Sequence, residues 1–124
     1  MVTKELWGKA NVYKAAAPLD ASRSITMIHV GGLNIPSLLG GFVTGGDISP
    51  DGRRVALCDY VRGYELVIGE GDAGSFDAIW KQPIKAIALG QRKQGEGICY
   101  RLDGKALLAT SEGSHSPLIE VVRR

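Results

Sequence analysis

The sequence predicts an all-β fold built from antiparallel sheets, and three observations support that prediction. Apolar residues alternate with a period of two, for example at Tyr64, Leu66 and Ile68, which is the periodicity of a β-strand. An Asp-Gly pair at 51–52 separates two such runs and is a strong hairpin signal, because glycine supplies the positive φ of a tight turn. The 17 glycines, often in pairs, fit many turns and few long helices.

The hairpin around this turn is repeated later in the chain. At a shift of 52 residues the turn at 51–52 falls on the Asp-Gly pair at 103–104. The same shift aligns RRVALCDY with KALLATSE and YELV with SPLI without a gap, and ITMIHVGGL and ANVYK match later segments more loosely. A repeat of this length, made of short strands with a glycine turn in a constant position, is typical of β-propeller blades or a similar array.

Nine strands follow from the periodicity and the turns. They are predicted at 9–15, 24–32, 42–48, 53–60, 63–69, 83–90, 96–101, 105–111 and 117–123. We expect one domain over 1–124, in which 1–33 supplies the outer strands of a split blade, 42–90 a complete blade and 94–124 a partial blade. The segment FDAIWK before Pro83 predicts a single helical turn, capped by Ser75.

The motif ISPDGRRVAL is similar to the TolB-type propeller repeat. The longer pattern VTGGDISPDGRRVA, followed by GEGICYRLDGKALLATSEG, resembles bacterial propellers related to the esterase-like phytase group. The likeness covers most of the chain from about residue 25 onward. It implies an antiparallel propeller architecture of about two four-stranded blades, and it says little about function.

Closed propellers have typically about 4 to 8 blades, and each blade covers the flat face of the next. A chain with only about two blades would leave apolar sheet faces exposed. Three arrangements would cover these faces. Copies of the chain could form a homo-oligomer, with three copies giving a six-bladed ring, and this is the favoured expectation. Alternatively, the sheets fold against each other as a β-sandwich-like monomer, or the chain is the remnant of a longer propeller.

Propeller topology predicts one face where several loops gather around a central channel. The residues expected on this face are Thr44, Asp47, Asp59, Tyr60, Arg62, Gln94, Glu96, Glu112 and His115. The resemblance implies that acids on such a face can hold calcium, a cation that prefers several oxygen ligands, and the acids concerned are Glu96, Glu112 and Asp47. The alternative is that the two glutamates bind backbone amides or pair with Arg62 and Arg92.

The sequence favours a noncatalytic module that binds a small ligand or a protein, or that assembles with itself, because no nucleophile, base and orienting group converge in a motif. One alternative is a calcium-dependent hydrolase of the phytase-like or esterase-like kind. Another is a propeller remnant without activity.

The composition and charge of the chain indicate which kinds of partner and which cellular compartment to expect. The net charge of +2 arises from 15 basic and 13 acidic residues that are interspersed, which argues against a nucleic-acid-binding surface. No apolar stretch approaches the length of a membrane helix or a signal peptide, so we expect no membrane partner and a cytoplasmic protein. Cys58 and Cys99 are expected to be buried free thiols.

Overall fold

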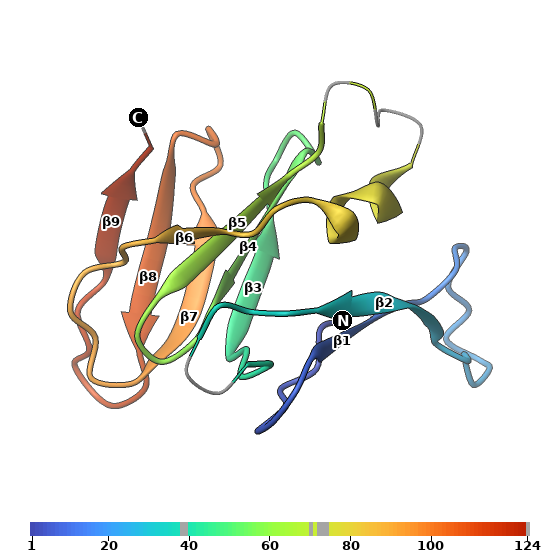
Figure 1. The fold of residues 1–124 in the computed structure, drawn as a ribbon, viewed down its shortest axis with the longest axis horizontal. Helices are drawn as coiled ribbons and strands as arrows, with labels where there is room; N and C mark the ends of the chain where they lie inside the picture. Colours follow the sequence, from blue (N-terminus) through green and yellow to red (C-terminus); the bar gives the residue numbers. More distant parts are fainter. Residues whose placement is uncertain (38–39, 70, 72–74, 124) are drawn as a thin grey trace.

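The computed structural model describes residues 1–37, 40–69, 71 and 75–123, and within them the fold is mostly β. The first sheet contains β1 (Ala10–Lys14) and β2 (Ile28–Leu33). The middle sheet has the order β3 (Gly45–Ile48), β4 (Arg54–Cys58), β5 (Gly63–Val67) and β6 (Lys85–Ile87). The third sheet contains β7 (Gly95–Tyr100), β8 (Ala106–Ser111) and β9 (Ile119–Val122). All pairings are antiparallel, and Figure 1 shows the middle sheet between the first and the third.

The all-β prediction is confirmed, and each predicted strand overlaps an observed one. The largest error is at 24–27, which was predicted to begin a strand but has no strand structure. The pairing of β1 with β2 ends where Lys14 meets Ile28, so the backbone before Ile28 has no partner strand in that sheet. The predicted helical turn is confirmed as the 3-10 helix η2 (Phe76–Lys81), and the Ser75 side chain accepts the amide of Asp77 as its N-cap.

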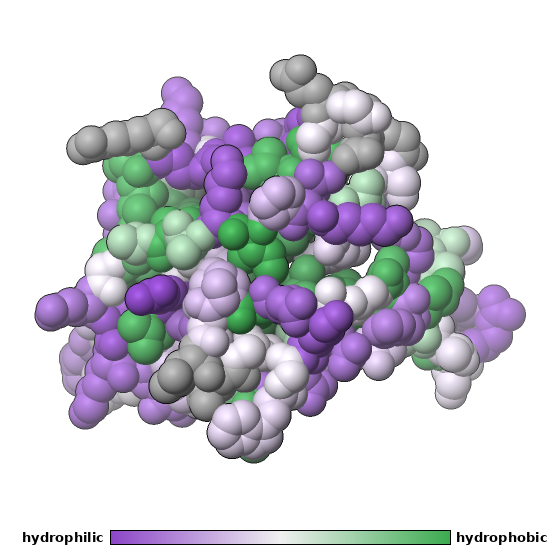
Figure 2. Space-filling model, viewed as in Figure 1, coloured by the Kyte–Doolittle hydropathy of each residue, from purple (hydrophilic) through white to green (hydrophobic). Residues whose placement is uncertain are grey.

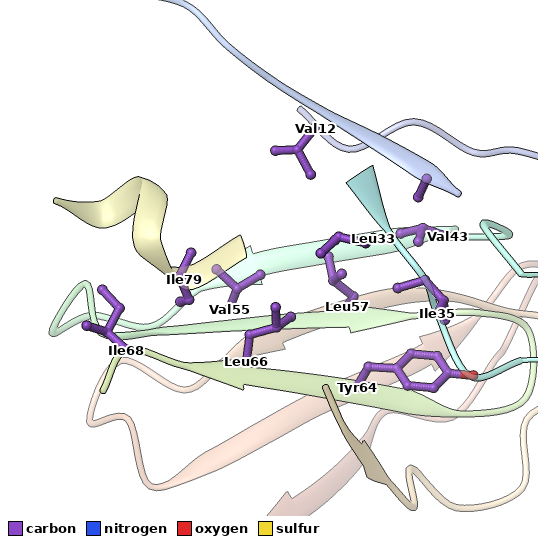
Figure 3. Close-up of a cluster of buried hydrophobic side chains, with 11 residues drawn as sticks. Val12, Leu33, Ile35, Val43, Val55, Leu57, Tyr64, Leu66, Ile68 and Ile79 are labelled. Carbon is purple, nitrogen blue, oxygen red and sulfur yellow. The ribbon is translucent and has the colours of Figure 1, made fainter. Parts of the chain in front are cut away.

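A first hydrophobic core lies between the first and middle sheets. Figure 3 shows its side chains pointing toward one another from both sheets and from η2. Its largest fully buried members include Val12, Leu57, Tyr64, Leu66 and Ile79. Full burial of one such side chain stabilises the fold by roughly 1.5–3 kcal/mol, so this core anchors the first sheet on the middle one.

A second core lies between the middle and third sheets, so the middle sheet is covered on both faces. Its buried members are Ala56, Cys58, Leu89, Ile98, Tyr100, Leu107 and Ala109. Successive residues of a strand point to opposite faces, so a strand that is covered on both sides is apolar throughout. This explains why β4 reads VALC without polar alternation and is buried over all four of these residues.

Hydrogen bonds and an ion pair reinforce the second core. The Glu65 carboxylate on β5 accepts the Tyr100 hydroxyl at 2.8 Å, and Arg123 donates to its other oxygen at 2.9 Å. Glu65 is buried, so these two donors replace the water that the charge has lost. The middle sheet and the two outer strands of the third sheet, β7 and β9, are thereby joined by one polar network.

The sequence repeat corresponds to a repeat of backbone geometry. Gly52 and Gly104 both have φ +67°, the left-handed conformation that favours glycine. Each donates its amide to the carbonyl three residues earlier at 2.8 Å, from Gly52 to Ser49 and from Gly104 to Arg101. The hairpins β3–β4 and β7–β8 therefore share one turn design.

The outer face of the third sheet is exposed and partly apolar. Val122 on β9 is 68% exposed, and Figure 2 shows hydrophobic surface at the side of the molecule where β9 lies.

The two cysteines differ in their exposure. Cys58 is buried as expected, whereas Cys99 is exposed, which corrects the expectation that both are buried; both thiols are free. The two thiols differ because Cys58 belongs to the doubly covered middle sheet and Cys99 points outward from β7. Among the described residues, no helix is long and apolar enough to cross a membrane.

Candidate functional site

Most of the residues predicted for the channel face gather at one end of the middle and third sheets. Thr44 precedes β3 and donates its hydroxyl to the Gly95 carbonyl at 2.7 Å. The Gly95 amide in turn donates to the carbonyl of Tyr60, in the β4–β5 turn, at 3.0 Å. The start of β3, the β4–β5 turn and the start of β7 are therefore held together by direct hydrogen bonds.

An aromatic pocket opens beside the β4–β5 turn. Its lining residues are Pro36, Ser37, Phe42, Asp59, Tyr60, Val61, Arg62 and Tyr64, and its volume is about 420 Å³. The rings of Phe42 and Tyr60 meet edge to face with centroids 4.9 Å apart. Lys4 lies over both rings, at 4.6 Å and 4.9 Å from their centroids, and donates to the Tyr60 hydroxyl at 3.2 Å. This arrangement offers an apolar, aromatic surface beside positive charge.

Asp59 lies in the wall of the aromatic pocket, but its carboxylate already accepts hydrogen bonds from neighbouring residues. One carboxylate oxygen accepts the amides of Val61 and Arg62 at 2.7 Å and 2.6 Å, and the other accepts the Tyr64 hydroxyl at 2.5 Å. Asp59 is buried, so these bonds compensate for its desolvation. Asp59 therefore shapes the turn that carries Tyr60, and its predicted place on a ligand-binding face stays a prediction.

Two tyrosines have a raised pKa because the fold favours their neutral form. Burial is the main cause at Tyr64 and Tyr100, followed by the hydrogen bond of each hydroxyl to a carboxylate, Asp59 and Glu65 respectively. Ionisation would place a phenolate in an apolar core next to a negative charge.

These raised pKa values predict a loss of stability in alkali. The contribution of each tyrosine is complete below the unfolded pKa of about 10 and is lost as the pH rises through the higher folded value. We therefore expect the urea concentration at the unfolding midpoint to decrease as the pH is raised above about 10. The Tyr100→Phe variant should lose part of this dependence, and equal pH profiles for this variant and the parent protein would contradict the assignment.

The acids proposed to hold calcium are not brought together as a set of three. Gln94 donates its amide to Glu112 at 2.7 Å and lies 3.4 Å from Glu96, so these two glutamates share one neutral partner. Asp47 lies farther along β3, where its carboxylate accepts the Tyr100 amide at 2.9 Å. Within the described part of the chain, no group of three or more His, Cys, Asp or Glu residues could hold a metal ion.

Asp47 corrects the predicted face, because it points toward the opposite end of β7. Thr44 contacts Gly95 at the start of β7, and Asp47 contacts Tyr100 at its end. Three residues of extended chain span about 10 Å, which is enough to separate the two contacts. Asp47 therefore joins two neighbouring strands and does not contribute to the loop face.

The proposed pairing of the glutamates with arginines is also not what the structure shows. Arg92 donates to the backbone carbonyls of Asp59 and Arg62 at 3.3 Å, and Glu96 has Lys4 as its nearest cation at 4.0 Å. His115 lies in the exposed turn after β8 at φ 58° and is not part of the lining of the pocket.

Sequence reasoning missed Lys4 and Phe42 as site residues. Phe42 belongs to the predicted strand 42–48 and reads as a packing residue, and Lys4 belongs to an N-terminal segment without any motif. The aromatic Phe42 beside a glycine pair was the one available signal. Nothing in the local sequence indicates that Lys4 reaches across to Tyr60, 56 residues later.

Comparison with family models finds no match, and comparisons with curated proteins and with solved structures find none either. The functional assignment therefore depends on the geometry of this chain.

Proposed function

We propose that the chain is a noncatalytic binding module built from propeller-type blades, and that it binds a small ligand in the aromatic pocket. The single observation that supports this best is the pocket of about 420 Å³, which lies at the loop end of repeated sheets and contains two packed aromatic rings. Small-molecule sites are typically concave and mostly apolar, with a few polar groups that orient the ligand. The face-to-face stacking of three antiparallel sheets supports the propeller part of the proposal.

The chemistry of the lining favours a flat apolar ligand that carries an acidic group. Phe42, Tyr60 and Val61 provide the apolar surface. The carboxylate of Asp59 already accepts two amides of its own turn and the Tyr64 hydroxyl of β5, so the charged group of the lining left for a ligand is the exposed Arg62. A guanidinium binds carboxylates and other oxyanions with good geometry.

Titration with 2-naphthoate tests the proposal, with backbone amide resonances as the readout. We expect saturable shifts in the β4–β5 turn, and at least about tenfold weaker binding in the Tyr60→Ala variant, which corresponds to about 1.4 kcal/mol. Tyr13→Ala is the matched control, because Tyr13 packs on His29 in the first sheet and is not part of the lining. Failure to bind, or an equal loss in both variants, would reject the pocket as the site.

Assembly into a closed ring of three copies stays a prediction of the sequence. The exposed apolar outer face of the third sheet supports self-association, because such faces are usually covered in soluble proteins. The calcium-dependent hydrolase has weaker support, because Glu96 and Glu112 share Gln94 and Asp47 is engaged elsewhere.

A further inference from the structure

A second hollow lies between the N-terminal residues and the free edge of the middle sheet. It has a volume of about 450 Å³, and it is lined by Met1, Val2, Lys4, Val43, Thr44, Gly45, Gly46, Asp47, Ile48, Val55, Leu57 and Trp80. We call this hollow the edge groove. Ile48 is 50% exposed in it although the residue is large and apolar. The edge groove therefore combines apolar surface with the open side of β3.

One wall of the edge groove is a short strand-like segment with an open backbone edge. Val2 forms an antiparallel bridge with Val12 of β1. The flanking hydrogen bonds, from Thr3 to Asn11 and from Tyr13 to Met1, are both 2.8 Å long. In an antiparallel pair the residue between two such bonds turns its own amide and carbonyl away from the partner strand. The Val2 amide and carbonyl thus point to the opposite edge of the segment.

The open edge of residues 1–3 faces the position that an inner strand occupies in the middle sheet. Residues 1–3 lie beside β1, and β1 pairs with β2, just as β4 lies beside β5 and β5 pairs with β6. In the middle sheet β3 occupies the next position, on the far side of β4. Among the described residues of the first sheet, no strand occupies the position that corresponds to β3.

The contact between β3 and β7 shows how two inner strands are held together. The Asp47 carboxylate on β3 accepts the Tyr100 amide of β7 at 2.9 Å. The Thr44 hydroxyl donates to the Gly95 carbonyl at the other end of β7 at 2.7 Å. Side chains of one inner strand therefore bind the open backbone edge of the next.

The same edge recurs on β3 and lines the edge groove. The repeat of 52 residues places Ile48 where Tyr100 stands in the second unit. The residues after them, Ser49 and Arg101, both donate their amides inside their own hairpins at 2.9 Å. The amide of Ile48 therefore points away from β4, just as the Tyr100 amide points toward Asp47.

We propose that the edge groove binds an extended, acidic peptide strand from another polypeptide, which pairs antiparallel with residues 1–3 and covers Ile48. A carboxylate on this strand would accept the Ile48 amide, as Asp47 accepts that of Tyr100. This mode of recognition adds a strand to an open sheet edge, where main-chain bonds give affinity and alternate side chains give specificity. The added strand would continue the existing row of inner strands β7 and β3.

Charge complementarity also favours an acidic strand. The edge groove contains Lys4 as a cation, whose ammonium group donates to the Tyr60 hydroxyl at 3.2 Å and has two further protons to donate. Its one acidic residue, Asp47, is already engaged by the Tyr100 amide. An incoming carboxylate would therefore meet a backbone amide and a lysine and would face no unpaired acid.

A peptide copying residues 42–49 of this chain, FVTGGDIS with blocked ends, is the appropriate probe, because β3 is the strand that occupies the corresponding position in the middle sheet. We expect saturable shifts of backbone resonances at residues 1–4 and along β3. Replacing the aspartate of the peptide by asparagine should weaken binding about tenfold, because a charge-assisted hydrogen bond is lost.

Two variants of the protein test the groove itself. Ile48→Ser removes the exposed apolar contact, and Val2→Pro removes the edge amide, so each should weaken binding at least about fivefold. Val122→Ser is the matched control, since Val122 is an exposed apolar residue of β9 outside the edge groove, and it should bind as the parent does. Absence of binding at millimolar peptide, or equal affinity of parent, Ile48→Ser and Val2→Pro proteins, would overturn the proposal. The linings of the two pockets have no residue in common, although Lys4 of the edge groove also lies over the Phe42 and Tyr60 rings. Tyr60→Ala tests only the aromatic pocket and Ile48→Ser tests only the edge groove, so either proposal can fail while the other holds.

Discussion

Gly45→Ala is expected to lower the free energy of unfolding by about 3 kcal/mol, because it forces two inner strands apart. A Cβ atom at Gly45 would lie 2.5 Å from the carbonyl oxygen of Glu96 and 3.2 Å from the Cys58 sulfur. The oxygen belongs to the backbone of β7, so no rotation of a side chain can relieve the overlap. The strands β3 and β7 would have to separate, which would also break the Thr44 hydrogen bond to Gly95.

The measurement is urea unfolding followed by circular dichroism, with Gly31→Ala as the matched control. Gly31 lies in β2, and a Cβ atom there would meet nothing within 4 Å. The control should therefore change the free energy of unfolding by less than about 0.5 kcal/mol. Similar effects of the two substitutions would show that β3 and β7 are not in close backbone contact.

Asp59→Ala is expected to have the second large effect, a loss of about 3 kcal/mol in the free energy of unfolding. The substitution removes the acceptor of two turn amides and of the buried Tyr64 hydroxyl. An unsatisfied buried donor costs about 1–3 kcal/mol, and the backbone amides can recover water more easily than the hydroxyl can. Because the turn carries Tyr60, naphthoate binding should weaken in this variant as well.

Asp103→Ala is the control for this substitution, since Asp103 also accepts a backbone amide, that of Lys105, at 2.9 Å in a turn. Its pKa is lowered mainly by that bond, and the residue is exposed. Removing it should change the stability much less than Asp59→Ala does, because water replaces the carboxylate. A second variant, Asp59→Ala with Tyr64→Phe, should recover part of the stability lost in Asp59→Ala, since the orphaned hydroxyl is gone. Thermal unfolding of the four proteins measures both effects, and no recovery would contradict the role given to Tyr64.

Much of the fold could be predicted because its signals are local. The alternation at Tyr64, Leu66 and Ile68 and the turns at Gly52 and Gly104 depend on neighbours a few residues away. The Ser75 cap of η2 is likewise set within three residues. Such features persist whatever packs against them, which is why the strands and the repeat could be read from composition and spacing.

The candidate site could be predicted only in part. Tyr60 and Arg62 lie in the β4–β5 turn and line the aromatic pocket, and a turn between two antiparallel strands must lie at the end of its sheet. The contact of Asp47 with the Tyr100 amide could not be predicted, since Tyr100 lies on another sheet. Lys4 could not be predicted as a site residue, since it contacts Phe42 and Tyr60 only through the tertiary packing of the N-terminal segment.

The sequence by itself determined the strands, their antiparallel hairpins and the 52-residue repeat, because these follow from backbone propensity and period. Only the tertiary structure decided that the three sheets stack with the middle one covered twice, which buries Cys58 and leaves Cys99 exposed. The tertiary structure also decided that the Asp59 carboxylate accepts the buried Tyr64 hydroxyl and that an open groove remains beside β3. Contacts between sheets join residues that are dozens of positions apart, and their geometry depends on how side-chain volumes fit together, which no local pattern encodes.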